Sequence, residues 1–421
     1  MGMAAIIYKK GAPDNFVWEE TKVGSPECGQ VRLRSTAVGV NFADTYHRAG
    51  IPHPMIVGDP PVVVGFEGVG EIEELGPGVT GFSVGERVCT CLPPLGAYSK
   101  ERLYPADKLI KVPKDLPLDD VQLAGLILKG MTAQYLLHRT HKVQPGDYVL
   151  IHAAAGGMGH ILCPWARHLG ATVIGTVSTD AKAEIARNLG CHHVINYSTE
   201  NFVAVTRNIT DGKGVDVVYE SIGKDTLQRS LDCLRLVGMC AAYGQASGVP
   251  DPINLIEDLG VRGSLMITRP VLSHYMSNRS EIDAGAESLF NAVAQGVVAS
   301  NVVKTFPLRE AAAAHNFIGG RKTTGSIVML PFCVNGSKKT SRHSIHTKRI
   351  SCRSYATKLD RYQTRIAVSR SLARQSFTAT SPISPASPPT QLSAISKPKL
   401  LKCCDASMSF STSRGPTNQS Y

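Results

Sequence analysis

Short apolar runs and turn residues alternate over roughly the first 125 residues. Apolar runs at residues 31–34 and 62–64 are separated by stretches rich in glycine and proline, such as residues 76–78 and 93–94. Brief apolar runs bounded by these residues are typical of strands joined by turns. The pattern predicts a small, partly barrel-like antiparallel unit over residues 1–125.

From about residue 145 the apolar pattern alternates between strand-like runs and segments of helical period. The strand-like runs are residues 148–153, 172–177, 193–196, 215–219 and 239–243. Such alternation predicts an α/β fold with a doubly wound parallel sheet. The nearly continuous apolar character of the runs fits strands buried on both faces. Residues 302–330 return to short strands around one helix, which we expect to rejoin the first unit.

Residues 331–421 show neither period. They hold 15 of the chain's 45 Lys and Arg, 18 serines and only two of its 34 acidic residues, which leaves residues 1–330 close to charge balance. Such a segment buries too little apolar surface to offset an ordering cost of roughly 1–2 kcal/mol per residue. We predict a basic, disordered C-terminal tail.

The tail allows a function of another class. Tyr355, Tyr362 and Phe377 are interleaved with its basic residues, a composition that suits phosphate contacts and base stacking in RNA binding. The other interpretations are a solvated extension without a role of its own, or sequence beyond a natural chain end near Leu330.

The cysteines and the start of the sequence indicate the cellular compartment. None of the 11 cysteines forms a CxxC pair, and the start of the chain lacks a basic segment followed by a long apolar run. Reduced thiols and the missing secretory signal predict a cytoplasmic protein. No apolar stretch of 18 residues is present, so no membrane association is expected.

A glycine-rich turn follows the first apolar run of the second unit. In residues 153–159 we expect Gly156 to allow a tight turn, and Gly157 and Gly159 to keep side chains out of the ligand and helix–strand contacts. Free N–H groups and the helix dipole then favour a pyrophosphate. Pro164 lies inside the next helix, where an unsupported proline costs about 3 kcal/mol and predicts a kink.

The end of the second strand of this unit indicates which dinucleotide binds. Folds that prefer NAD usually place an acid there to hold the ribose hydroxyls, whereas this strand ends at Val177 and Ser178. Ser178, Lys182 and Tyr197 suit a 2′-phosphate, although Asp180 is near them. Together these residues favour NADPH.

Five segments resemble the zeta-crystallin-like quinone oxidoreductases of the medium-chain dehydrogenase/reductase superfamily. They are residues 38–46, 128–133, 153–159, 194–197 and 321–325, and the resemblance runs in order through residues 1–330. It implies a GroES-like catalytic domain at 1–125 completed by 299–330, a Rossmann NADPH-binding domain at 126–298, a cleft between them, and a homodimer.

The resemblance also implies roles for single residues. Asn41 would hold the nicotinamide carboxamide, and Tyr46 would line the nicotinamide pocket and face the quinone; with Asp44 they are the catalytic candidates. The further implied cofactor contacts are Lys129, Thr132, Ala155, Gly156, Gly157, Met158, Gly159, Ser178, Lys182, Tyr197, Ser221, Tyr243, Gly244, Gln245, Ile267, Thr268 and Arg321.

Zinc ligands are missing from the positions where zinc-dependent relatives carry them. Those relatives have a first-domain Cys and a Gly-His-Glu element, whereas this chain has residues 39–42 without Cys and Phe66 in place of the His. A structural zinc site needs four clustered ligands, and only Cys89 and Cys91 lie in that region. The histidines show no ligand spacing and are interpreted as surface or packed residues: His47, His53, His138, His141 and His152.

Without a metal Lewis acid the substrate must accept a hydride or electrons unaided. A quinone fits because aromatisation stabilises its reduced form. We therefore predict an NADPH:quinone oxidoreductase that positions cofactor and quinone in a dry cleft. The alternative is an alkenal or enone reductase, which adds hydride to a carbon–carbon double bond in the same kind of cleft.

Overall fold

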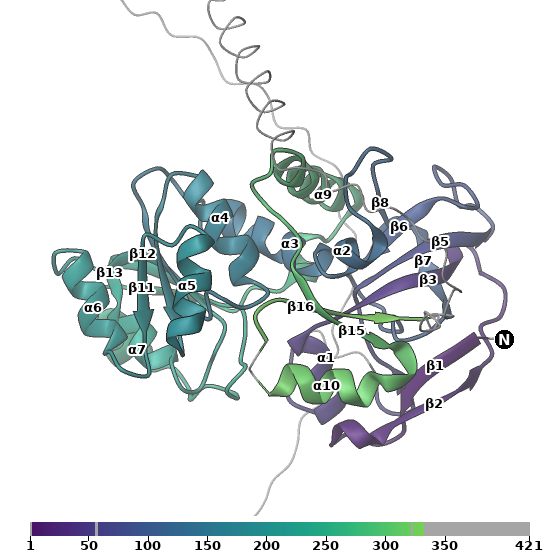
Figure 1. The fold of residues 1–421 in the computed structure, drawn as a ribbon, viewed down its shortest axis with the longest axis horizontal. Coiled ribbons are helices and arrows are strands. Elements are labelled where there is room, and N and C mark those ends of the chain that lie inside the picture. The colour runs from purple at the N-terminus through teal and green to yellow at the C-terminus, as the bar shows by residue number, and fades with distance from the viewer. Residues whose placement is uncertain (1, 55–57, 321–322, 332–421) are drawn as a thin grey trace, which may run out of the picture. The chain divides into compact units, whose positions relative to one another are not determined.

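The computed structural model describes residues 2–54, 58–320 and 323–331 (Figure 1). The strands of residues 1–125 pair antiparallel with one another, as their apolar pattern predicts. Among the described residues, one sheet has the strand order β2-β1-β4. A larger sheet has the order β15-β16-β3-β5-β6-β8, and β7 also pairs with β3. These strands are β1 (Gly2–Ile7), β2 (Phe16–Thr21), β3 (Gln30–Val40), β4 (Val62–Val63), β5 (Gly68–Leu75), β6 (Arg87–Thr90), β7 (Glu101–Pro105), β8 (Ile110–Lys111), β15 (Val302–Pro307) and β16 (Ser326–Leu330).

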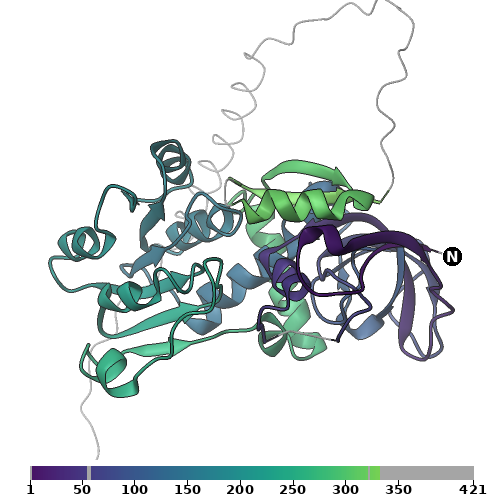
Figure 2. The same ribbon diagram turned by 90° about the horizontal axis from the view of Figure 1, so that it is seen from below.

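The C-terminal strands of the described chain return to this sheet. β16 pairs antiparallel with β3, through contacts such as Val328 opposite Gly39, and β15 pairs parallel with β16. Figures 1 and 2 show β15, β16 and α10 (Ala311–Gly319), in green, against the purple N-terminal strands and α1 (Phe42–Ala49). The segment that follows the second unit therefore helps to build the first.

The second unit is a parallel sheet with crossover helices. Within the described residues its strand order is β11-β10-β9-β12-β13-β14, which confirms the α/β fold with a doubly wound parallel sheet. The strands are β9 (Tyr148–Ile151), β10 (Thr172–Val177), β11 (His193–Asn196), β12 (Val215–Glu220), β13 (Leu234–Ala242) and β14 (Met266–Thr268). The helices are α4 (Gly159–His168), α5 (Asp180–Asn188), α6 (Phe202–Ile209), α7 (Leu227–Asp232), α8 (Leu272–Tyr275) and α9 (Arg279–Ala294), with π-helical turns η3 (Leu136–Thr140) and η4 (Leu255–Gly260).

Two helices, α2 (Asp120–Ala124) and α3 (Ile127–Tyr135), connect the units. Leu126, Ile127 and Met131 are fully buried in a core that draws on both units. At Gly130 an added Cβ would lie 2.5 Å from Leu289, so only glycine lets α3 and α9 approach this closely. That packing fixes the position of α3, whose other side chains face the site described below.

Pro164 does not interrupt its helix. α4 is continuous from Gly159 to His168, although proline removes one bond of its ladder. Leu162, Trp165 and Ala166 are buried against the core, and this packing supports the helix that Pro164 weakens. The helix therefore continues through Pro164, and the kink there stays a prediction.

Two further predictions, the basic tail and a cofactor contact, concern residues that the structure does not describe. The basic tail, apart from Pro331, and the predicted contact Arg321 are not among the described residues. In the part that is described, no helix has the length and apolarity needed to cross a membrane.

Candidate functional site

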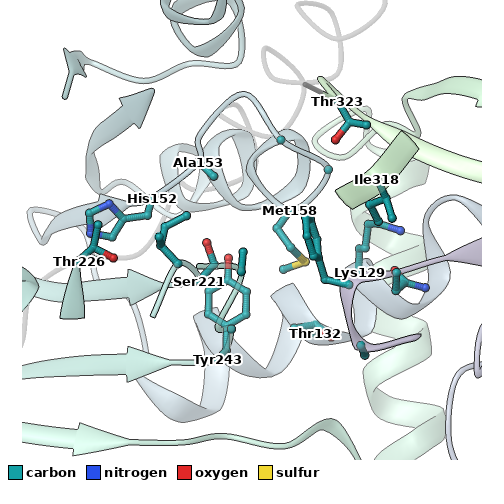
Figure 3. A pocket seen from close by; sticks show the side chains of 18 of the residues that line it. Lys129, Thr132, His152, Ala153, Met158, Ser221, Thr226, Tyr243, Ile318 and Thr323 are labelled. Carbon is teal, nitrogen blue, oxygen red and sulfur yellow. The ribbon is translucent and has the colours of Figure 1, made fainter. Parts of the chain in front are cut away.

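A cavity of about 530 Å³ lies where the two units meet. Its walls come from the start of α1, one face of α3, the glycine turn before α4, the carboxyl ends of β10 and β13, and four residues of the returning segment, Ile318, Thr323, Gly325 and Ile327. Figure 3 shows Met158 of the turn between Lys129 and Ser221. In parallel α/β sheets, ligands bind outside the carboxyl ends of the strands.

The glycine turn leaves donors exposed to the cavity. Gly156 donates its N–H to Ala153 O at 2.8 Å and closes the turn, while the N–H groups of Gly157 and Met158 have no acceptor among the described residues. An added Cβ at Gly159 would lie 2.0 Å from Ala154 O. The start of α4 therefore packs directly on the backbone of the turn that follows β9, and the turn presents backbone donors at a helix N-terminus, which fits a pyrophosphate.

The residues predicted for a 2′-phosphate lie together at one end of the cavity. Ser178 and Tyr197 follow paired strand ends of β10 and β11, and Lys182 Nζ donates to Ser178 Oγ at 3.4 Å. Asp180 does not compete, because its carboxylate accepts a 2.9 Å hydrogen bond from the Asn196 amide. This end carries a hydroxyl, a phenol and an ammonium group, a set that suits a phosphate monoester.

A buried polar cluster supports the same end. Glu220 accepts from the N–H groups of Ile222 and Gly223 at 2.6 and 3.1 Å, and from Ser230 Oγ at 2.5 Å. His152 bridges Thr176 and Ser230 and lies 3.5 Å from Glu220. Burial lowers the pKa of His152, so the imidazole is neutral near neutral pH.

His152, expected from the sequence to be an ordinary surface or packed histidine, has a further place in the structure. It is packed, but it also lines the cavity beside Thr226 (Figure 3), with Phe202 and Arg229 as further lining residues. Because these residues come from α6 and α7, only the tertiary fold brings them to the strand ends.

At the other end of the cavity Asn41 and Lys129 share one buried carboxylate. Glu67 Oε2 accepts from Asn41 Nδ2 at 2.7 Å and from Lys129 Nζ at 3.4 Å, and Oε1 accepts from Leu128 N–H at 2.9 Å. Glu67 is fully buried and Lys129 nearly so. Since Thr132 lies one helical turn after Lys129, both line the same wall of the cavity.

Asp44 lies behind this wall. It is fully buried and does not line the cavity; its Oδ2 accepts from Asn41 N–H at 2.8 Å and from the Tyr98 hydroxyl at 3.1 Å. Burial raises the pKa of Asp44 to about 7. Its place in the first turn of α1 turns the carboxyl back toward Asn41, so it positions Asn41 and cannot contact a ligand.

Tyr46 lines the cavity from α1 and is nearly buried. Gln245 connects it to the second unit: its N–H donates to Tyr46 Oη at 3.4 Å, and its side-chain amide donates to Pro52 O at 2.8 Å. Gln245 therefore ties the two units together rather than lining the cavity itself.

The structure brings most of the predicted contacts into one cavity. Those that line it are Asn41, Tyr46, Lys129, Thr132, Ala155, Gly156, Gly157, Met158, Ser178, Lys182, Tyr197, Ser221, Tyr243 and Gly244. Those that do not are Asp44, Gly159, Gln245, Ile267 and Thr268, and Arg321 lies outside the described residues.

Sequence analysis missed several lining residues near Tyr46. His53, Tyr135 and Arg269 line the cavity there. Arg269 comes directly after β14, a three-residue strand that the apolar pattern does not single out. The basic residue after the short β-prone run Met266 to Thr268 is the signal that could have indicated it.

No cluster of three or more His, Cys, Asp or Glu side chains suited to a metal occurs in the described part of the chain. Phe66, at the position where zinc-dependent relatives carry a His, is fully buried and packs edge-on against His47. Burial raises the pKa of the Cys89 thiol well above its usual range.

Two family models match the chain. "Alcohol dehydrogenase GroES-like domain" covers residues 27–148 and "Zinc-binding dehydrogenase" covers residues 157–287. The chain is 78% identical to a 2-haloacrylate reductase of a Burkholderia species over 79% of the chain and 99% of that protein. It is 41% identical to a quinone oxidoreductase of Pseudomonas aeruginosa over 76% and 97%. Escherichia coli quinone oxidoreductase, solved in complex with NADPH, superposes with a TM-score of 0.74 at 38% identity, covering 78% of this chain and all of that one.

Proposed function

The chain belongs to the zinc-independent, quinone oxidoreductase-like group of the medium-chain dehydrogenase/reductase superfamily, and on that basis we propose that it reduces an electron-poor carbon–carbon double bond with NADPH. The double bond is conjugated to a carbonyl or carboxyl group. This proposal takes the alternative of the sequence analysis in place of quinone reduction.

The observation that carries the proposal is the difference between two sets of relatives. The 78% identical relative is named for the reduction of a 2-haloacrylate, whereas the relative named for quinones is 41% identical. The expected chemistry, hydride transfer to a substrate without a metal, is common to both. The choice between the two acceptors therefore rests on similarity and on the shape and charge of the cavity near Tyr46.

NADPH is the cofactor, and the residues of the cavity fit it. The free N–H groups of Gly157 and Met158 would hold its pyrophosphate, and Ser178, Lys182 and Tyr197 its 2′-phosphate. Asn41, fixed by Glu67, would hold the nicotinamide carboxamide. When bound, NADPH supplies the hydride that adds to the carbon β to the activating group.

The chain's own residues then complete the reduction. As the β-carbon gains hydride, the π electrons move toward the activating carbonyl, and a proton must reach the α-carbon. Tyr46 Oη, at the wall of the cavity, is the group we assign to deliver that proton, and solvent restores it. Val271 and Leu272 line the same end and exclude bulk water.

We propose that the enzyme is a homodimer joined at β14. This strand pairs only with β13 among the described strands, so one of its edges is open. Leu236 belongs to the neighbouring β13, and Leu255, Ile256 and Val261 belong to the segment that leads into β14; these four side chains are exposed by 71, 73, 73 and 77%. An open edge strand with apolar neighbours can meet its own copy about a twofold axis.

The fate of a labelled hydride tests the proposed reaction. NADPH carrying deuterium at C4 would be oxidised with an alkenoic acid or an enone, and the product examined by NMR. We expect the deuterium on the β-carbon and a solvent proton on the α-carbon. If NADPH is oxidised only when a quinone is present, and the alkene is recovered unchanged, double-bond reduction would be wrong and quinone reduction would be favoured.

A further inference from the structure

Arg269 places a guanidinium group at the Tyr46 end of the cavity. Its Nη1 donates to Ala242 O at 2.7 Å, at the end of β13, and its Nη2 donates to Gln245 Oε1 at 3.4 Å. The same Gln245 donates its N–H to Tyr46 Oη. Arg269 and Tyr46 therefore contact one residue from two sides, and both line the cavity.

The charge of Arg269 has no counterion in the described chain. No carboxylate lies within 4.0 Å of it, in contrast to Lys129 at the same end, which pairs with Glu67. The one acidic side chain among the described lining residues, Asp225, lies with Thr226 in the loop between β12 and α7. Burial lowers the pKa of Arg269, while the Tyr46 and Tyr135 hydroxyls act in the opposite direction.

The guanidinium group also has more N–H donors than its hydrogen bonds within the described chain use. An arginine has five N–H donors in a planar fork that matches a carboxylate, and two of Arg269's donate to neutral oxygens of the described chain. A half-buried cation with unfilled donors and apolar neighbours is costly unless an anion joins it. Leu128, Val271 and Leu272 supply those apolar neighbours in the same cavity.

We propose that Arg269 binds the carboxylate of the substrate, so that the enzyme selects small alkenoic acids over neutral alkenes and quinones. The inference rests on the proposed double-bond reduction and names its substrate class. A carboxylate on Arg269 places the conjugated double bond near Tyr46, because both side chains flank Gln245. A neutral enone of the same size fills the apolar part of the cavity and leaves the guanidinium without an anion.

A matched pair of substrates tests the role of Arg269. The kcat/KM for 2-chloroacrylate and for its methyl ester is measured with the wild type, Arg269→Gln and Arg269→Lys. Arg309→Gln is the control, because this exposed arginine lies outside the cavity. We expect Arg269→Gln to lose about tenfold to a hundredfold for the acid, mainly through KM, and under threefold for the ester. Arg269→Lys should recover part of the loss.

A binding measurement separates this inference from the proposed reaction. Saturated 2-chloropropionate and its methyl ester cannot accept hydride, and calorimetry gives their affinity for the enzyme–NADPH complex. We expect the acid to bind the wild type at least tenfold tighter than Arg269→Gln, with the ester unaffected. If no alkene is reduced but this difference persists, the proposed reaction fails and the anion site stands. Equal binding of the acid to both proteins, or equal losses for acid and ester, would overturn the anion site.

Discussion

The Asn41 side-chain amide donates a 2.7 Å hydrogen bond to Oε2 of Glu67, and this contact fixes a cavity-lining amide on a fully buried carboxylate. The same carboxylate holds Leu128 N–H and Lys129 Nζ. Gly39 makes the arrangement possible, since an added Cβ there would lie 2.1 Å from Glu67 Oε2. One carboxylate therefore orients both the loop before α1 and the start of α3.

Replacing Glu67 should cost stability as well as activity. In Glu67→Ala the Lys129 ammonium and two amide donors lose their acceptor, and breaking a buried pair in this way costs about 3–5 kcal/mol. Urea denaturation would show a lower midpoint with an unchanged slope. Glu71→Ala removes an exposed partner of Arg34 and should cost about 1 kcal/mol or less. Similar losses in the two variants would contradict the role of Glu67.

The glycine turn should not tolerate a methyl group where Gly159 contacts the backbone of Ala154. Gly159→Ala forces Ala154 O away from a Cβ that would lie 2.0 Å from it, and strain of this kind typically costs about 1–3 kcal/mol. Because the turn would shift, NADPH affinity should fall, as measured by fluorescence titration. Gly319→Ala, where an added Cβ meets no atom within 4 Å, should leave affinity unchanged.

The choice of NADPH over NADH should depend on Lys182. Lys182→Ala removes a charged contact to the 2′-phosphate and should raise the KM for NADPH about tenfold or more. The KM for NADH should stay within about twofold, because NADH lacks that phosphate. Lys142→Ala, an exposed lysine outside the cavity, is the control. A parallel rise for both cofactors would contradict this assignment.

Asp44 should make the wild type lose stability as pH rises. Burial raises its folded-state pKa to about 7 from an ordinary value of 3.8. A group with a raised pKa contributes fully below pH 4, and that contribution declines as pH rises through 7. Relative to Asp44→Asn, the wild type should therefore lose up to ~4 kcal/mol between pH 4 and pH 7. A constant difference in unfolding free energy across this range would contradict the pKa assignment.

The proposed dimer should depend on the apolar residues near β14. Leu255→Asp with Ile256→Asp places two charges on side chains that are 73% exposed, so the monomer should keep its fold. Light scattering after size exclusion should show the wild type at twice the mass of this variant. A wild type that runs as a monomer would contradict the dimer, and Val84→Asp, an exposed site elsewhere, should change nothing.

Sequence patterns predicted the fold well where they report local structure. The predicted strands at 172–177 and 193–196 coincide with β10 and β11, because long apolar runs between helical segments have one stable arrangement. Local patterns did not indicate β14, because three residues carry too little periodicity. At Pro164 the buried face of α4 offsets the local penalty, and the helix continues through the proline.

The residues of the site also divide into those that belong to local sequence motifs and those that only the fold brings together. The glycine turn and the residues after β10 and β11 belong to local motifs, and the fold brings them to one cavity. Arg269, His53 and Arg229 come from segments without a recognised motif and meet only in three dimensions. Asp44 follows Asn41 by three residues and is of a type suited to catalysis. Its place in α1 directs the carboxyl toward the Asn41 backbone and away from the cavity, and the sequence alone does not reveal that direction.

The central claim is that the enzyme reduces an activated double bond with NADPH. The most direct test compares kcat/KM for 2-chloroacrylate, 1,4-benzoquinone and 9,10-phenanthrenequinone, with NADPH as the donor and a metal chelator present throughout. The account predicts saturating, chelator-resistant turnover of 2-chloroacrylate with a kcat/KM above that of either quinone. Turnover of the quinones with no reduction of 2-chloroacrylate would contradict it.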